Sequence, residues 1–402
     1  MRIAVVGAGV VGVATAYLLA REGHSVVLID GACEPGRGAS AGNAAQLSWA
    51  YADAMASPAL LRHLPAIMAG RDPAFRVRWR LDPDFLLWGL RFLANAPGWR
   101  WRGNTDAILR LAGESREEME KLLAEVDIDF DYRLAGKLHL YPDEASLAAA
   151  KPGVERKRRL GFEQSILSLS EAQAVEPALQ NYQGEIAGAV YTPGDAMGDA
   201  AAFCRQLTRH MADHLGVVTC FNRQVVGFEQ RHGKLTALRF ADHEPLETDR
   251  AVVTAGPLIH GLMADLPEVA DVQPVRGYSL TIARSPNAPL VSLTDVKRKL
   301  AFVAIGDRFR VAGLADIERP GAGFDAGRFD VLHAAARSVL PGCFDDAQEL
   351  MRWSGERPMT PSSSPMIRRS RNITGVYVNA GHGMLGWTLA LGSARRITNF
   401  LV

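Results

Sequence analysis

The sequence predicts a two-domain α/β protein, in which a Rossmann-like domain with a parallel sheet accompanies a second domain of the α+β class. The 402 residues are enough for two domains. Residues 2–30 have the pattern of a strand, a glycine-rich turn, a helix and a second strand, which predicts the parallel sheet. A second glycine-rich turn, at residues 381–386, also lies between an apolar run and a helix-like stretch.

The first glycine-rich turn has the spacing of a dinucleotide-binding site. Gly7, Gly9 and Gly12 form a G-x-G-x-x-G pattern between the apolar run 2–6 and a helical segment. We expect a tight turn at Gly7, close approach of a pyrophosphate at Gly9 and close helix–strand packing at Gly12. Asp30 ends the second strand, where an acidic side chain can bind ribose hydroxyls. The pyrophosphate would lie at the positive N-terminal end of the helix.

The composition is that of a soluble globular protein, without a basic field that would attract nucleic acid. Hydrophobic residues make up 48% of the chain and charged residues 22%, and the formal net charge is +1. The four cysteines are scattered, with no CxxC motif and no Cys/His cluster, which predicts the reduced thiols of a cytoplasmic protein and no metal site. Residues 3–20 and 375–394 are uncharged, but their glycines argue against a membrane span or a signal peptide.

The segment after Asp30 favours FAD over NAD as the dinucleotide. An NAD dehydrogenase would continue with another βαβ unit, whereas residues 31–48 are loop-like and rich in small residues. Ser40, Asn43, Gln46 and Ser48 in this segment would let a bulky ring system lie against the backbone. An NAD-dependent dehydrogenase remains a weaker alternative.

Seven segments occur in an order that resembles one enzyme family: GAGVVG, GASAGNAAQLS, TPGDAMGDAAAFC, VRGYSLTI, FRVAGLADI, WSGERPMTPSSSP and GHGMLGWTLALGS. Together they resemble the flavin-dependent D-amino acid dehydrogenases of the small-subunit type, within the D-amino acid oxidase and glycine/sarcosine oxidase superfamily. The resemblance covers nearly the whole chain. It implies oxidative deamination of a D-amino acid to a 2-oxo acid and ammonia, with hydride passing from the α-carbon to N5 of FAD.

The resemblance also implies how the two domains divide the chain. The FAD-binding domain is discontinuous and comprises residues 1–60, 195–260 and 350–402. The substrate-binding domain, with a mostly antiparallel sheet, comprises residues 61–194 and 261–349.

The same resemblance implies which residues contact FAD. The backbone of Val225 would meet the adenine, and the second glycine-rich turn would face the pyrimidine end of the flavin and stabilise negative charge there. His382 is predicted as a cofactor contact and not as a general base, because hydride transfer from a neutral amine needs none. The predicted cofactor contacts are Gly7, Gly9, Val10, Val11, Gly12, Asp30, Ser40, Asn43, Ala44, Gln46, Leu47, Val225, Ala255, Gly256, His382, Gly383, Met384, Leu385, Gly386 and Thr388.

Two residues are predicted to hold the substrate. Arg357, in WSGERPMTP, resembles the family arginine that binds the substrate carboxylate, and its planar guanidinium suits bidentate pairing. Tyr278, in RGYSL, resembles a tyrosine that shares this carboxylate or closes the pocket. The alternative for Tyr278 is a core position in a strand.

Departures from the family pattern leave the substrate open. Met384 stands where a small hydroxyl residue is usual, Ser362–Ser364 replace an Asp-Gly pair, and DAMGD occupies residues 195–199. One alternative is therefore a cyclic or N-substituted amine, such as D-proline, 4-hydroxy-D-proline or sarcosine. Another is a non-catalytic FAD-binding subunit of a larger complex.

The partners expected are an amino acid and an electron acceptor, either a quinone of a respiratory chain or oxygen. Residues 82–101 contain three tryptophans and are interpreted either as a peripheral anchor on the inner membrane or as core and subunit contacts. A homo-oligomer and a hetero-oligomer are both compatible with the sequence.

Overall fold

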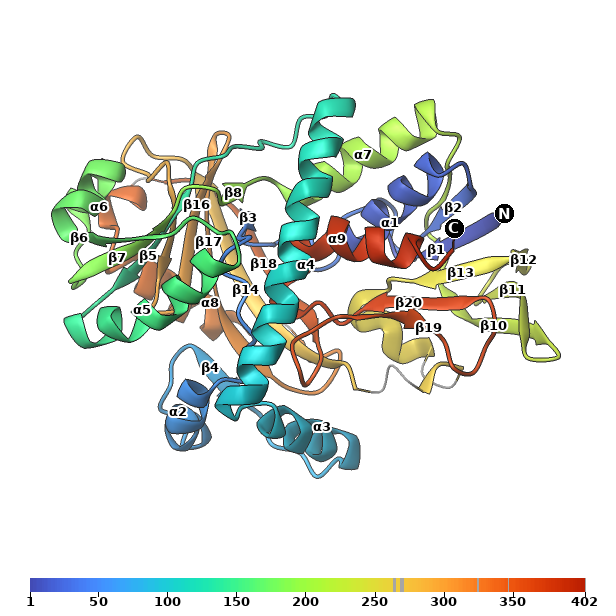
Figure 1. The fold of residues 1–402 in the computed structure, drawn as a ribbon, viewed down its shortest axis with the longest axis horizontal. Helices are drawn as coiled ribbons and strands as arrows, with labels where there is room; N and C mark the ends of the chain where they lie inside the picture. The colour runs from blue at the N-terminus through green and yellow to red at the C-terminus, as the bar shows by residue number, and fades with distance from the viewer. Residues whose placement is uncertain (263–264, 268–270, 324, 346, 402) are drawn as a thin grey trace.

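A six-stranded sheet assembled from distant parts of the chain forms one half of the molecule (Figure 1). The computed structural model describes residues 1–262, 265–267, 271–323, 325–345 and 347–401. The strand order is β19-β20-β13-β1-β2-β9, with every neighbouring pair parallel except β19 and β20. The strands are β1 (Arg2–Val6), β2 (Ser25–Ile29), β9 (Val218–Cys220), β13 (Arg250–Val253), β19 (Met366–Arg369) and β20 (Val376–Ala380).

Both faces of this sheet are covered, which explains why its strands are almost continuously apolar. Side chains alternate between the faces, so Ile3 and Val5 pack toward the helices, whereas Ala4 and Val6 pack toward a small antiparallel sheet. The helices are α1 (Val10–Arg21), α4 (Gly98–Glu125), α7 (Ala200–His214) and α9 (Gly386–Thr398). The small sheet consists of β10 (Val225–Arg231), β11 (Lys234–Phe240) and β12 (Leu246–Glu247).

A nine-stranded, mostly antiparallel sheet forms the other half (Figure 1). Its order is β18-β14-β17-β16-β15-β5-β7-β6, and β4 pairs with β17. Only the pairs β15–β5 and β17–β4 are parallel among its described pairings. The strands are β4 (Phe75–Val77), β5 (Lys137–Tyr141), β6 (Ser165–Ser168), β7 (Gly188–Thr192), β14 (Gln273–Ala283), β15 (Ser292–Asp295), β16 (Leu300–Ile305), β17 (Arg308–Ile317) and β18 (Glu349–Met359).

The remaining elements cover the nine-stranded sheet or connect the two halves. Helix α8 (Ala326–Arg337) packs on β14 and β17, and Phe329 and Leu332 join the second core there. The other elements are α2 (Pro58–Met68), α3 (Pro83–Ala94), α5 (Glu144–Arg159), α6 (Leu169–Val175), the pair β3 (Gln46–Leu47) and β8 (Ala196–Met197), and the 3-10 helices η1 (Pro177–Asn181), η2 (Gly256–Leu262), η4 (Pro341–Cys343) and η5 (Gly383–Leu385).

One predicted domain boundary differs from the structure. The segments 1–60, 195–260 and 350–402 contain all the strands of the six-stranded sheet. However, β18 pairs with β14 along almost its whole length, so residues 350–359 belong to the nine-stranded sheet. Among the described strands, β14 is the one that β18 pairs with, so its ladder hydrogen bonds form there. The chain therefore returns to the six-stranded sheet at β19.

Candidate active site

The turn between β1 and α1 forms a concave backbone surface, the glycine cradle, in which side chains at Gly7 or Gly12 would collide with neighbouring backbone. Gly7 has a φ of +108°, and a Cβ atom on it would lie 2.7 Å from the carbonyl oxygen of Thr254. A Cβ atom on Gly12 would overlap the carbonyl oxygen of Gly7. At the start of α1, the Val10 N–H donates to Ser40 Oγ at 3.1 Å. This geometry suits a phosphate at the helix N-terminus.

Asp30 lies at the end of β2, beside this turn. Its carboxylate accepts from the N–H groups of Ala8, at 2.6 Å, and Ala32, at 2.8 Å. A carboxylate has about four lone-pair sites, so acceptor capacity for a ribose hydroxyl remains. The backbone of Asp30 is bonded to Cys220 and Arg223, which brings the start of β10, at Val225, to the same edge.

A cavity of about 440 Å³ lies between the segments that precede α1 and α9 and the nine-stranded sheet. The predicted contacts that line it come from the start of α1, the segment after β2, the second glycine-rich turn and the start of α9: Val10, Ser40, Asn43, Ala44, Gln46, His382, Gly383, Met384, Leu385, Gly386 and Thr388. The predicted contacts outside this lining are those at or beside the first turn, and the core residue Leu47: Gly7, Gly9, Val11, Gly12, Asp30, Leu47, Val225, Ala255 and Gly256. The two glycine-rich turns therefore belong to neighbouring parts of one extended site.

The second glycine-rich turn directs the N-terminus of α9 at the cavity. Gly381 and Gly383 have φ values of +81° and +55°, which glycine adopts without strain. Thr388 Oγ1 accepts from the N–H of Ser48 at 3.1 Å, which joins α9 to the end of β3. The positive end of α9 thus faces the cavity wall, where it favours negative charge.

His382 is buried at the start of this turn. Its Nε2 atom lies 2.9 Å from Ser393 Oγ of α9. Burial lowers the pKa of His382 to about 3, because the charged imidazolium would lose its hydration. The ring is therefore neutral at physiological pH, as expected of a residue with no role as a cationic acid.

We expect the buried His382 to make the protein less stable in acid. Below pH of about 6.5 the unfolded chain binds a proton at this histidine that the folded protein does not bind until about pH 3. Because the unfolded state then binds more protons, the free energy of unfolding decreases as the pH is lowered, by at most about 1.4 kcal/mol per pH unit. Urea unfolding at several pH values between 7 and 4 measures this dependence. The free energy of unfolding should change less with pH in His382→Asn than in the parent protein. An equal change in both proteins would contradict this explanation.

Arg357 lies on β18 and lines the cavity. Its Nη1 donates to the carbonyl oxygen of Leu314 at 3.1 Å. Within the part of the chain that the structure describes, no carboxylate forms an ion pair with it. Burial lowers the pKa of Arg357 to about 10, although the charge of Asp316 opposes this, so the guanidinium stays charged at neutral pH. A charged, unneutralised guanidinium of this kind is suited to pair with an anion.

Gly277 makes room for this guanidinium. It lies on β14, and a Cβ atom there would overlap the guanidinium of Arg357. If Arg357 binds a substrate carboxylate, we expect Gly277→Ala to displace the guanidinium and to raise KM about tenfold, with FAD content unchanged. Gly153→Ala, where a Cβ would meet nothing within 4 Å, is the matched control. An unchanged KM in Gly277→Ala would show that the guanidinium does not need this space.

Tyr278 does not contribute to the cavity, so its predicted contact with the substrate is corrected. Its hydroxyl donates to Asp316 at 2.9 Å, and its ring packs against Phe329 in the second core. Neighbouring residues of a strand point to opposite faces, and Gly277 is the one that faces Arg357. The core alternative for Tyr278 is the correct one.

Trp353 and Lys137 line the cavity but were not among the predicted site residues. Cβ atoms on Gly42 and Gly355 would both overlap the indole ring of Trp353, so the ring is closely surrounded. The alternation W-S-G-E-R was the available signal, since it places Trp353, Gly355 and Arg357 on one face of the strand. No such signal surrounds Lys137, because its hydrogen-bond partners Gln46 and Ser48 are about ninety positions away in the sequence.

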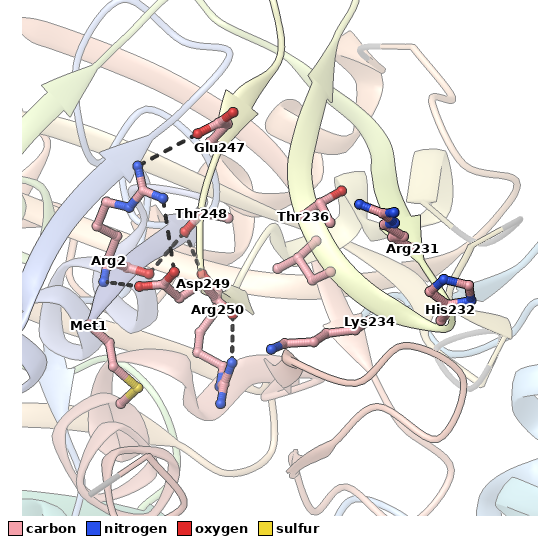
Figure 2. Close-up of a pocket in the computed structure, with 11 residues that line it drawn as sticks. Met1, Arg2, Arg231, His232, Lys234, Thr236, Glu247, Thr248, Asp249 and Arg250 are labelled. Atoms are coloured by element: carbon pink, nitrogen blue, oxygen red, sulfur yellow. Dashed lines mark hydrogen bonds and ion pairs between the residues drawn. The ribbon is translucent and has the colours of Figure 1, made fainter.

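A second cavity, of about 610 Å³, lies at the opposite end of β1 (Figure 2). It is bordered by Met1 and Arg2 and by residues of β11, β12 and β13. Arg2 is already paired with Glu247 and Asp249, at 3.9 and 4.0 Å. Ligands of parallel sheets bind beyond the carboxyl ends of the strands, which is the end with the glycine-rich turn. We therefore place the functional site in the first cavity.

Comparison with known proteins agrees with this geometry. A family model described as FAD dependent oxidoreductase matches residues 2–400. The chain belongs to this family. This FAD dependent oxidoreductase is 38% identical over 411 aligned positions to D-amino acid dehydrogenase 2 of Ralstonia nicotianae, an alignment that covers 100% of this chain and 96% of the relative. The predicted resemblance, the α/β fold class, the oxidoreductase activity and FAD as the cofactor are confirmed.

Solved structures share the fold of this FAD dependent oxidoreductase. L-proline dehydrogenase from P. horikoshii has a TM-score of 0.74 at 17% identity, covering 100% of this chain and 93% of the other. Glycine oxidase from Bacillus cereus has a TM-score of 0.71 at 18% identity, covering 100% and 94%.

The residues of this family member fit FAD. The glycine cradle and the start of α1 suit a pyrophosphate, Asp30 suits a ribose, and the cavity between Ser40 and Thr388 can receive a ring system. Lys137 and Arg357 also line this cavity, and each is a cation that suits an anionic group.

Proposed function

We propose that this oxidoreductase converts D-amino acids to 2-oxo acids and ammonia. The observation that carries the proposal is the unneutralised guanidinium of Arg357, in the same cavity as the residues proposed to hold FAD. An amino acid brings the carboxylate that this guanidinium lacks. The name of the Ralstonia nicotianae relative, a D-amino acid dehydrogenase, supports the same substrate class.

The chain itself binds and orients the substrate. Arg357 holds the carboxylate, while Leu314, Trp353 and Met384 bound the space around it. Burial lowers the pKa of His382 to about 3 and its Nε2 atom lies within hydrogen-bond distance of Ser393, so it is too weak a base to take the proton from the amine. FAD, when bound, supplies a two-electron acceptor for the hydride of the α-carbon. Water then hydrolyses the imino acid product.

The test is anaerobic bleaching of the bound flavin by a panel of D- and L-amino acids. The panel includes both proline enantiomers, the 4-hydroxyproline isomers and sarcosine. We expect bleaching by D-amino acids and none by their L-enantiomers. Bleaching by L-amino acids alone, or by none of the panel with FAD bound, would overturn the proposal. The second outcome would favour a non-catalytic FAD-binding subunit.

A cyclic or N-substituted amine is the second candidate substrate. Met384 lines the cavity with its side chain 48% exposed, together with the apolar side chains of Met55, Phe75 and Leu314. These groups narrow the space beside Arg357, which suits a compact secondary amine such as D-proline. Faster bleaching by D-proline or 4-hydroxy-D-proline than by D-alanine would select this candidate.

We also propose that the electron acceptor is reached at a membrane surface. Helix α3 buries Phe85, Trp88 and Phe92 but exposes Leu86, Leu87 and Leu90 on another side. Together with the exposed Trp99 in the first turn of α4, these leucines are called the α3 surface. The segment 58–102 around it contains eight arginines and three aspartates. Arg76, Arg78, Arg80 and Arg91 already pair with carboxylates, and the remaining arginines of the segment complement anionic lipid. Among the described residues, no helix has both the length and the apolar character needed to cross a bilayer. Peripheral contact from the cytoplasmic side is the arrangement we propose.

Replacing Leu86 and Leu90 together with serine should weaken vesicle binding about tenfold, because each leucine loses apolar contact with the lipid. Co-sedimentation with vesicles that contain anionic phospholipid measures this. Val331→Ser, at an exposed apolar position of α8, is the control. Equal sedimentation of the three proteins would assign the α3 surface to a subunit contact instead.

A further inference from the structure

Three cationic side chains line the cavity in the described part of the chain, beside the neutral His382. Lys299 is neutralised by Asp72, whose Oδ2 lies 2.7 Å from its Nζ. Lys137 and Arg357 form no ion pair with any described carboxylate. Arg357 is assigned above to the substrate carboxylate. Lys137 is thus a cation of the site without an assigned anion.

Lys137 is the first residue of β5, and it is buried. Its Nζ donates to Gln46 Oε1 at 2.9 Å and to Ser48 Oγ at 2.7 Å, and it lies 4.9 Å from the ring centre of Tyr51. Both acceptors are neutral and belong to the segment that lines the cavity from the cofactor side. Ser48 is joined through its N–H to Thr388 at the start of α9. Lys137 therefore connects β5 to the cofactor-side wall.

The surroundings of Lys137 do not neutralise it directly. Burial lowers its pKa to about 8, against the attraction of Asp195. Asp195 is also buried; one of its oxygens accepts from Ala50 N–H at 3.1 Å, and the other has no partner. Lys157, whose charge also lowers the pKa of Lys137, is paired with Asp53 at 2.6 Å. A buried ammonium without an adjacent counter-ion is costly, so an anion at this edge of the cavity would relieve the cost.

The reaction brings two negative charges into a site with two unneutralised cations. The first is the substrate carboxylate. The second arises when a neutral amine gives up a hydride: the substrate is oxidised to a cationic imine, and the acceptor gains two electrons, one proton and thus one unit of negative charge. We propose that Lys137 is a positioning residue that holds Gln46 and Ser48 and stabilises the charge that the cofactor gains on reduction. This inference rests on the proposed placement of FAD in the cavity, and not on which amine is oxidised.

The test compares the flavin midpoint potential of Lys137→Met and Lys137→Gln with that of the parent holoenzyme, by dye equilibration without substrate. We expect at least a tenfold loss in the equilibrium constant for reduction, which is about 30 mV for a two-electron couple. Lys137→Arg should retain the parent potential. Lys299→Met combined with Asp72→Asn, which removes a cation together with the anion that neutralises it, is the matched control and should not shift the potential.

An unchanged potential in the neutral variants would overturn the inference. If the potential is unchanged and the variants lose only the oxidation of amino acids with acidic side chains, the inference is overturned. Lys137 would then bind a second carboxylate of the substrate. If Lys137→Met loses FAD, the potential of Lys137→Gln decides, since glutamine retains donors for Gln46 and Ser48. Because no substrate enters the measurement, a shifted potential would support the inference even if the bleaching panel identified another substrate.

Discussion

Arg357→Gln should lower kcat/KM for amino acid substrates about a thousandfold. Among the described residues, the guanidinium has one hydrogen-bond acceptor, the carbonyl of Leu314, so its other N–H groups could pair with the substrate carboxylate. Removing one member of a buried, hydrogen-bonded charge pair costs about 2–5 kcal/mol, which spans this factor. Glutamine keeps a donor but loses the charge and the planar pair of N–H groups. Steady-state kinetics measures the loss.

The design includes a charge-retaining variant and a matched control. The kcat/KM of Arg357→Lys should lie between those of the parent and of Arg357→Gln, because lysine keeps the charge but loses the bidentate geometry. Arg352→Gln removes an exposed arginine of the same strand that pairs with Glu349, and it should leave kcat/KM near the parent value. FAD content should be equal in all of them. If Arg357→Gln retains the parent kcat/KM, the carboxylate is bound elsewhere.

Gly12→Ala should reduce FAD affinity at least about a hundredfold. The added methyl group would overlap the carbonyl oxygen of Gly7 and lie 2.6 Å from Thr254 Oγ1. The first of these is backbone, so α1 must move away from β1, and the N–H groups that face the pyrophosphate move with it. Overpacking of this kind typically costs about 1–3 kcal/mol, and displacement of the phosphate donors adds to it.

Flavin content after purification and titration of the apoprotein with FAD measure this effect. Gly103→Ala, a glycine of α4 with open space at its Cβ position, should bind FAD like the parent. Full flavin occupancy in Gly12→Ala would show that α1 can shift without disturbing the cradle.

The parts of the site that depend on short sequence spacing could be predicted. The spacing of Gly7, Gly9 and Gly12, followed by Asp30, specifies a strand, a turn and a helix within about thirty residues, and the structure has them. The second glycine-rich turn is local in the same way. The boundary at residue 350 was missed because the length of β18 is set by its partner β14, which is far away in the sequence.

The parts that depend on sheet assembly could not be predicted. Tyr278 and Gly277 are neighbours, and only the pairing of β14 with β18 decides which of them faces Arg357. Lys137 reaches the cavity because β5 lies beside β15 and near the β3 segment, a contact between residues about ninety positions apart. No local pattern around Lys137 carries this information.

An isolated β-bridge joins Met359, at the end of β18, to His382, at the start of the second glycine-rich turn. Arg357 is two residues before Met359, so the proposed carboxylate anchor and the turn proposed to face the flavin are joined through this bridge. Directed evolution can exploit this arrangement. Substitutions at Leu314 and Phe75, on β17 and β4, should broaden the range of substrate side chains that the enzyme accepts, and the rate of hydride transfer should stay at the parent value. Substitutions at Met359 should alter the substrate range and the rate of hydride transfer together.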